Sequence, residues 1–120
     1  MPKEFSRTQR VSELIQRELA YLIQREMGDS HLGLITISMV EMSADLKEAR
    51  VYITILGGNT PLEQTVQSLN DAAGLLRHHL SQRLTLRTTP RLQFIYDNSL
   101  EQGNRLLALI DSIKSDDHNT

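Results

Sequence analysis

Two helical patterns meet at Ala72-Ala73-Gly74 with no loop between them, and this junction limits the possible folds more than any other feature. Apolar residues recur at helical spacing on both sides of the junction: Leu62, Val66 and Leu69 before it, Leu76, Leu80 and Leu84 after it. Glycine inside a helix costs about 1 kcal/mol relative to alanine, so we expect a kink and local strain at Gly74. The small side chains would also let another backbone come close.

The segment that follows the junction is basic. Between Asp71 and Asp97 there is no acidic residue, although the net charge of the whole chain is -2. The same interval contains two histidines and four arginines, namely Arg77, Arg83, Arg87 and Arg91. A basic segment with a helix break, in an acidic chain, is a candidate site for a polyanion. The alternative is a helical corner whose arginines are simply solvated.

Three segments alternate between apolar and polar residues, as strands do. One face of each is apolar: Ile35, Ile37 and Met39 in 34–40; Ala49, Val51, Ile53 and Ile55 in 49–55; Leu92, Phe94 and Tyr96 in 91–96. The first two segments are joined by Ser43-Ala44-Asp45-Leu46, where Ser and Asp can bond their own backbone and form a turn. We interpret the charges around this hairpin, including Lys47 and Arg50, as a mixed solvent edge.

Helical periodicity predicts two further helices, one near each end of the chain. The first has its apolar stripe at Val11, Leu14, Ile15, Leu19, Leu22 and Ile23, after a polar arm over residues 1–6 with Ser6 or Thr8 as the cap. If that helix reached back to Lys3, the spacing of seven would put Lys3, Arg10 and Arg17 on one face. Thr60-Pro61-Leu62-Glu63 and Ser99-Leu100-Glu101-Gln102 resemble capping boxes, the second before a last helix with Leu106, Ile110 and Ile113.

Several functional classes are disfavoured. The chain has no cysteine, so it has no disulfide and no thiolate metal site. Gly57-Gly58 lacks the following Gly-Lys-Ser/Thr of a phosphate loop. His78 and His79 have no further ligands at metal spacing, and together with Asp71 and Asp97 they form no catalytic dyad or triad. We therefore predict no metal, no cofactor and no enzymatic activity. Aromatic residues make up only 4% of the chain, which weakens a base-stacking hypothesis.

No apolar run approaches a membrane span, and the first residues lack the apolar core of a signal peptide, so we expect a cytoplasmic protein. The order of elements predicts an α+β domain: helix, strand, strand, helix, kink, helix, strand, and a terminal helix, with a three-stranded sheet. We expect one domain over residues 1–114 and a disordered polar tail over 115–120. This order is that of a KH module of the second type, although the G-x-x-G loop of such modules is absent.

Several segments, in this order, resemble the bacterial ribosome-binding factor A family, whose single KH-like domain has an Ala-x-Gly kink. The segments are residues 7–11, 43–52, 72–77, 84–87 and 90–99. The resemblance implies a KH-like fold and a late assembly factor that binds the immature 30S subunit and 16S ribosomal RNA. It also implies support of rRNA processing and of growth in the cold, no catalytic activity, and release by a partner GTPase. We expect a monomer.

The predicted RNA surface consists of Arg77, Arg83, Arg87 and Arg91 around the kink. If the first helix packs beside the kinked pair, Lys3, Arg7, Arg10 and Arg17 extend this surface. Arginine suits phosphate because its planar guanidinium makes bidentate contacts, so we expect recognition of shape and phosphate with little base readout. The alternatives are a generic KH-type protein that binds single-stranded nucleic acid, and a protein-only adaptor that uses its last helix.

Overall fold

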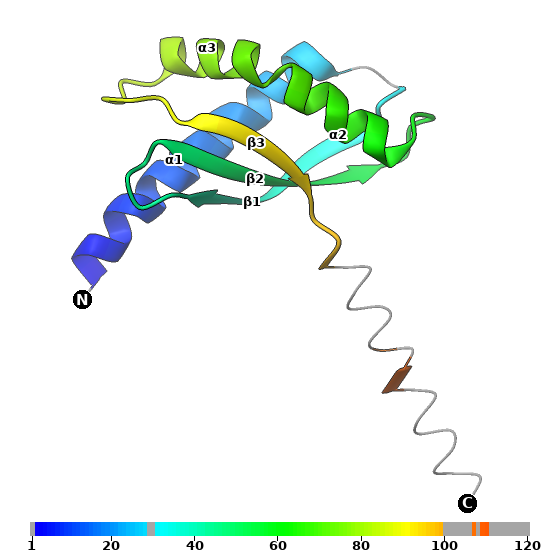
Figure 1. Ribbon diagram of the computed structural model, residues 1–120, viewed down its shortest axis with the longest axis horizontal. Helices are drawn as coiled ribbons and strands as arrows, with labels where there is room; N and C mark the ends of the chain where they lie inside the picture. Colours follow the sequence, from blue (N-terminus) through cyan, green and yellow to red (C-terminus); the bar gives the residue numbers. More distant parts are fainter. Residues whose placement is uncertain (1, 29–30, 100–106, 108, 111–120) are drawn as a thin grey trace, which may run out of the picture.

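The order of helices and strands agrees with the predicted α+β class. The computed structural model describes residues 2–28, 31–99, 107, 109 and 110, and only the backbone of residues 2–6. Its elements are α1 (Pro2–Met27), β1 (Leu34–Met42), β2 (Glu48–Leu56), α2 (Leu62–Asp71), α3 (Ala73–Arg83) and β3 (Arg91–Tyr96) (Figure 1). Most of the predicted last helix, including Leu106 and Ile113, and the tail over 115–120 lie outside the described residues.

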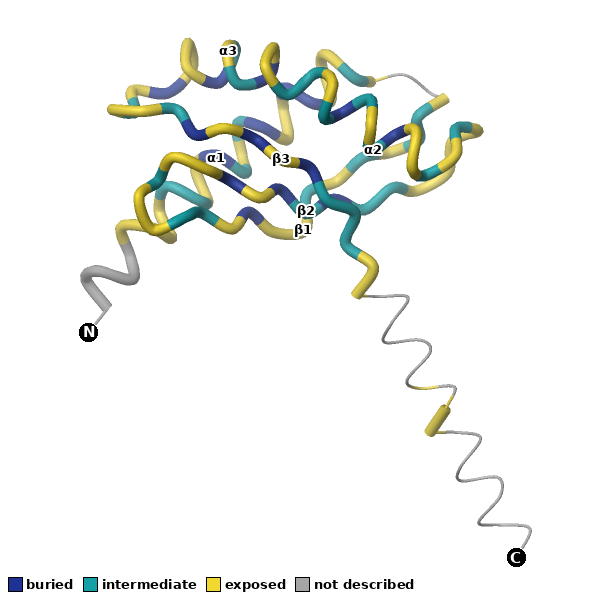
Figure 2. The backbone as a smooth tube through the Cα atoms, viewed as in Figure 1, coloured by how far each residue is buried: buried dark blue, intermediate teal, exposed yellow. Residues whose placement is uncertain are grey.

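The three strands form one sheet in the order β1-β2-β3. β1 and β2 pair antiparallel through the predicted turn, whereas β2 and β3 pair parallel, with Glu48 opposite Arg91 and Ile53 opposite Tyr96. A parallel pair needs a long crossover, and α2 and α3 provide it. Buried strand residues alternate with more exposed ones along the strands (Figure 2), because the helices cover one face of the sheet and leave the other open.

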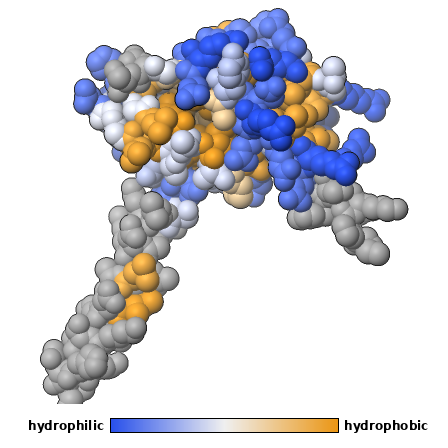
Figure 3. All heavy atoms as spheres, turned by 180° about the vertical axis from the view of Figure 1, so that it is seen from behind, coloured by the Kyte–Doolittle hydropathy of each residue, from blue (hydrophilic) through white to orange (hydrophobic). Residues whose placement is uncertain are grey.

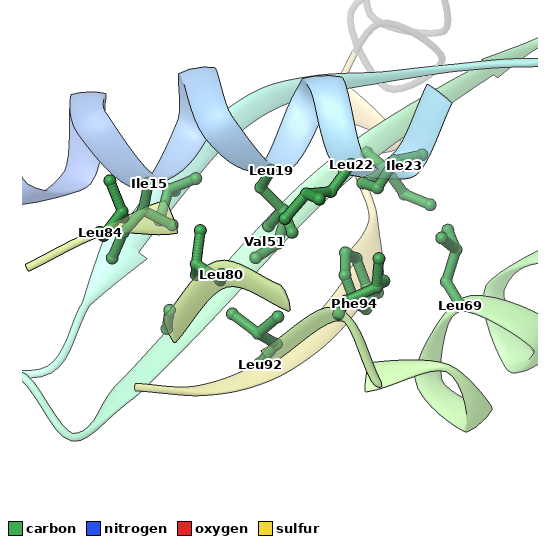
Figure 4. Packing of buried hydrophobic residues seen from close by; sticks show 14 residues of the cluster. Ile15, Leu19, Leu22, Ile23, Val51, Leu69, Leu80, Leu84, Leu92 and Phe94 are labelled. Carbon is green, nitrogen blue, oxygen red and sulfur yellow. The ribbon is translucent and has the colours of Figure 1, made fainter. Parts of the chain in front are cut away.

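The core lies between this face and the three helices. From α1 it receives the predicted stripe residues Ile15, Leu19, Leu22 and Ile23, with Val11 packed against them. Figure 4 shows the four core residues on the side of α1 that faces the sheet and α3, with Leu19 close to Val51 and Ile15 close to Leu84. Leu14, also predicted in this stripe, is instead 37% exposed, because it lies at the border of the buried face. Phe94 of β3, which is 2% exposed, lies near Leu69 of α2. Each such side chain contributes about 1.5–3 kcal/mol by leaving water, so the apolar periodicity is what holds the helices on the sheet.

A β-bulge changes the face of one predicted strand residue. The register shifts between Ile37 and Met39, so Val40 is buried and Met39, predicted to face the core, is 47% exposed. The extra residue is Ser38, whose hydroxyl lies 2.6 Å from Asp97 Oδ2 and 3.2 Å from the Tyr52 carbonyl. The hydrogen bond from Ser38 lowers the pKa of Asp97, with a further contribution from Ser99. One inserted residue flips all later side chains of a strand, which is why simple alternation failed here.

Two predicted helix caps are wrong. α1 begins at Pro2, so Ser6 and Thr8 lie inside the helix rather than capping it. At α2 the N-cap is Pro61, and no side chain caps the helix. The Thr60 hydroxyl instead donates to the His31 carbonyl at 2.8 Å, because this loop packs against the loop before β1. Gly58 has a positive φ, and a Cβ on it would lie 2.6 Å from the backbone nitrogen of Gly33, so the glycine serves this packing.

Side-chain amides from the helices bond the backbone of both edge strands. Gln16 of α1 donates to the Ile37 carbonyl of β1 at 3.3 Å. Asn70 of α2 makes a pair of bonds with β3: its Nδ2 donates to the Phe94 carbonyl at 3.0 Å, and its Oδ1 accepts from the Phe94 N–H at 2.8 Å. Asn70 thus replaces the neighbouring strand that Phe94 lacks on this side. Pairing of this kind reduces the risk of edge-to-edge association.

Asn70→Ala should lower the free energy of unfolding by about 2 kcal/mol, because the half-buried N–H and carbonyl of Phe94 lose their partner. Urea unfolding followed by circular dichroism measures this change. Gln67→Ala is the control, since Gln67 on the same helix is exposed and bonds the exposed side chain of Asp71, so its loss should change stability by less than about 0.5 kcal/mol. Equal stability of the two variants would contradict a structural role of the Asn70–Phe94 pair.

Candidate nucleic-acid interface

The helix break falls at one residue, Ala72. Its backbone, with φ −87° and ψ 0°, lies between two sets of helical hydrogen bonds: its N–H donates to Ser68 and its carbonyl accepts from Leu76. Gly74 lies two residues later, inside α3. Its φ is not positive, and a Cβ added to it would meet no atom within 4 Å. The strain expected at Gly74 is therefore absent, and the glycine leaves the helix surface bare beside the break.

Arg77 ties the start of α3 to the loop before β3. Its Nε and Nη2 both donate to the Thr89 carbonyl, at 3.1 and 2.9 Å. The guanidinium has five N–H groups, so three remain for another acceptor. A hollow opens on each side of this bridge. The first, of about 410 Å³, is lined by Gly74, Arg77, His78, Ser81 and Thr89. The second, of about 360 Å³, is lined by Asp45, Lys47, Glu48, Arg77, Thr88 and Arg91.

The parallel pairing of β2 and β3 brings Lys47 to this site. The Arg91 N–H donates to the Lys47 carbonyl at 2.8 Å, so the end of the hairpin turn lies beside the first residue of β3. Both side chains are exposed, and neither forms an ion pair with a described residue. The sequence alone predicts that Lys47 belongs to a mixed solvent edge. No local signal marks it, because its neighbour Arg91 is far away in the chain.

The turn that carries Lys47 is held by side chains, as predicted from Ser43 and Asp45. Asp45 Oδ1 accepts from the Ser43 hydroxyl at 2.7 Å and from the Lys47 N–H at 3.0 Å. These bonds favour the charged carboxylate, and the pKa of Asp45 lies below its ordinary value, first because of Ser43 and then because of the Lys47 backbone. The backbone of Lys47 is therefore fixed, while its exposed side chain belongs to the lining of the second hollow.

The structure divides the predicted arginine surface into separate groups. Arg77 and Arg91 share the second hollow, and exposed Arg87 lies in the loop 84–90. Arg83 faces α1 instead, where its Nη2 lies 3.2 Å from Glu18 Oε2. Arg7, Arg10 and Arg17 are exposed on α1. The side chain of Lys3 is not among those that the structure describes. The RNA-binding role of these residues stays a prediction.

This arrangement suits a phosphate chain better than a small molecule. Both hollows are open, and the second presents three cations, Lys47, Arg77 and Arg91, to a ligand. Beside the first, the bare surface at Gly74 lets a backbone approach the Ser81 hydroxyl and the His78 ring. Asp45 and Glu48 also line the second hollow, so its three cations exceed its two carboxylates by one charge. Residues of the turn, the loop and α3 therefore lie together at this site, although they are separate in sequence.

Other chemistry finds little support. No group of three His, Asp or Glu side chains in the described ranges could hold a metal ion. His79 is half-buried, and its Nε2 lies 3.5 Å from Glu26 Oε1. A third hollow of about 430 Å³ includes both partners of the Arg50–Glu41 ion pair, in which the charges cancel at 3.3 Å. None of the described helices has the length and hydropathy of a membrane span.

Comparison with known proteins gives one consistent result. The family model for ribosome-binding factor A matches residues 7–110. The ribosome-binding factor A of Nitrosococcus oceani is 53% identical over 111 residues, which cover 92% of this chain and 87% of that protein. Its counterpart from Thioalkalivibrio sulfidiphilus is 48% identical over 117 residues, which cover 98% and 91% of the two chains.

Solved structures agree with the sequence comparison. The crystal structure of ribosome-binding factor A from Thermus thermophilus superimposes with a TM-score of 0.66 at 28% identity, covering 74% of this chain and 94% of that chain. A homology model of the Thermus thermophilus ribosome binding factor A, fitted into a cryo-EM map of its complex with 30S, gives a TM-score of 0.61 at 29% identity. That match covers 71% of this chain and 89% of the other.

Gly74→Ala should raise the free energy of unfolding by about 1 kcal/mol, because alanine is the better helix former and its Cβ meets open space. Urea unfolding tests this value. A lower stability would show that the glycine is needed by the fold itself. Gly74→Leu should also fold, so any loss of RNA binding by that variant reports crowding at the bare surface.

Proposed function

Since the chain belongs to the ribosome-binding factor A family, we propose that it binds the immature small ribosomal subunit as an assembly factor. The observation that carries this proposal is the cationic hollow of Lys47, Arg77 and Arg91 beside the helix break. The reported complex of the Thermus thermophilus relative with 30S supports the choice of partner. In this proposal 16S ribosomal RNA is the part of the subunit that the hollow contacts.

The proposed mechanism is recognition of phosphates and of RNA shape. Arg77 is held by the Thr89 carbonyl, so its remaining N–H groups are already oriented before RNA arrives. Preorganisation reduces the entropy lost on binding. Binding favours one late conformation of the RNA only by the difference in affinity between that conformation and its competitors. Without a G-x-x-G loop, a clamp for single strands is not expected, and free oligonucleotides should bind weakly.

The finer biological role is part of the same proposal. The protein would support 16S rRNA processing and small-subunit maturation, including in the cold, and it would act in the cytoplasm as a monomer without catalysing a reaction. A partner GTPase would release it from the subunit. Residues 1–114 would form the RNA-binding domain, with 115–120 as a polar tail.

The main test is co-sedimentation with immature and mature small subunits at several salt concentrations. Wild type should prefer the immature particle. The double variant Lys47→Gln, Arg91→Gln should bind more weakly, and the slope of log K against log salt should fall by roughly two, since two phosphate contacts are lost. These two side chains are suitable because they are exposed and free of ion pairs with described residues, whereas Arg77 and Arg83 also hold the fold.

The matched control is Asn59→Asp, Gln64→Glu, which makes the same change in net charge on exposed residues of another part of the surface. It should keep the wild-type salt slope. If both variants bind equally, the hollow does not contact RNA. If the wild-type protein binds neither the immature nor the mature subunit, the proposed function itself is wrong.

A further inference from the structure

The outward face of α1 has a stripe of exposed side chains that the core does not use. Arg10, Leu14, Arg17 and Tyr21 follow one another at steps of four, three and four, so they lie on one side of the helix. Tyr21 is 48% exposed and Leu14 is 37% exposed. Figure 3, seen from behind, shows strongly hydrophilic side chains across much of this side of the molecule, beginning near the grey N-terminal residues.

Two cations lie close to the ring of Tyr21. The guanidinium carbon of Arg83, from α3, lies 4.5 Å from the ring centroid, and that of Arg25 lies 5.6 Å from it. Each of these arginines also has a carboxylate partner: Glu18 bonds Arg83, and Glu26 bonds Arg25 at 3.1 Å. The two ion pairs therefore fix the cations beside the ring. Tyr21, the two arginines and their two carboxylates therefore form one connected group of side chains at the α1–α3 contact.

The remaining cations of the stripe are uncompensated. No described residue forms an ion pair with Arg10 or Arg17. Arg17 and Tyr21 are one helical turn apart, about 6 Å along the axis, so one nucleotide can contact both. Glu18, which follows Arg17 in the chain, is already bonded to Arg83, and Glu13 accepts a hydrogen bond from Gln9. A partner for this face should therefore carry negative charge and also offer a flat apolar group.

We propose that Tyr21 and Arg83 form a stacking platform for an unpaired base of RNA, with Arg17 and Arg10 on the neighbouring phosphates. Unpaired bases are commonly held on aromatic rings and guanidinium planes. The inference rests on the proposed RNA binding but concerns a separate site: Arg77 and Arg83 project from different flanks of α3. It also departs from the expectation of little base stacking, which rested on the low aromatic content of the chain. One well-placed ring is enough for one base.

The test compares Tyr21→Leu, which keeps apolar volume, with Tyr21→Phe, which keeps the ring. Binding is measured to immature subunits and to protein-free 16S rRNA. Stacking on one ring implies a loss of roughly tenfold in affinity for Tyr21→Leu, on both ligands. Tyr21→Phe should stay within about twofold of wild type. Because the side chain is half exposed, unfolding in urea should show that all three proteins are folded.

A spectroscopic readout reports the stacking itself. The chain has no tryptophan and three tyrosines, so its fluorescence comes from tyrosine. The difference between the spectra of wild type and Tyr21→Phe isolates the Tyr21 signal. A stacked base should quench this difference signal when rRNA is added. The double variant Arg10→Gln, Arg17→Gln should lower the salt slope by roughly two if both contact phosphates.

The outcomes separate this inference from the proposed function. If wild type binds the subunit and Tyr21→Leu binds as tightly with no quenching, the platform does not exist, while the assembly role stands. If Tyr21→Leu loses affinity for subunits but not for protein-free rRNA, the ring contacts a ribosomal protein and the inference is overturned. If wild type binds neither ligand, both proposals fall.

Discussion

The parallel pairing of β2 with β3 is the constraint on which the rest of the structure depends. A parallel neighbour cannot be reached by a hairpin, so the chain must cross the sheet between the two strands, and α2 and α3 make that crossing. The break at Ala72 lets α2 and α3 run in different directions across the sheet. The same pairing places Lys47 beside Arg91 and thus assembles a cationic hollow from two distant segments.

Charge is distributed between structural and available groups. Arg77 bonds the Thr89 carbonyl, and Arg83 bonds Glu18, so both contribute to the way α3 sits against its neighbours. Lys47, Arg91, Arg10 and Arg17 have no such partner among the described residues. In an acidic chain, a local excess of free cations is what can attract a polyanion, because opposite charges that are already paired add little to the field at a distance. Counting arginines along the sequence does not separate these two groups.

The edge strands show how a small three-stranded sheet avoids open pairing positions. Asn70 bonds both the N–H and the carbonyl of Phe94, and Gln16 bonds the Ile37 carbonyl. Each amide comes from a helix that also supplies core residues, Leu69 beside Asn70 and Ile15 beside Gln16. Burial of the apolar residue therefore positions the polar one. The opposite face of the sheet has its own polar contact, in which Ser38 of the bulge reaches Asp97 beyond β3.

The sequence by itself determined the α+β class, the order of the elements from α1 to β3, most of the buried face of α1, the face of β3, and the turn at Ser43 and Asp45, because each rests on local periodicity or on bonds within a few residues. Only the tertiary structure decided the bulge at Ser38, the loop contact that takes Thr60 away from a cap, and the division of the arginines. It also decided that Lys47 meets Arg91 and that Arg83 meets Tyr21. These contacts join residues that are far apart in the chain, and their partners are set by strand register and helix packing, which leave no local pattern in the sequence.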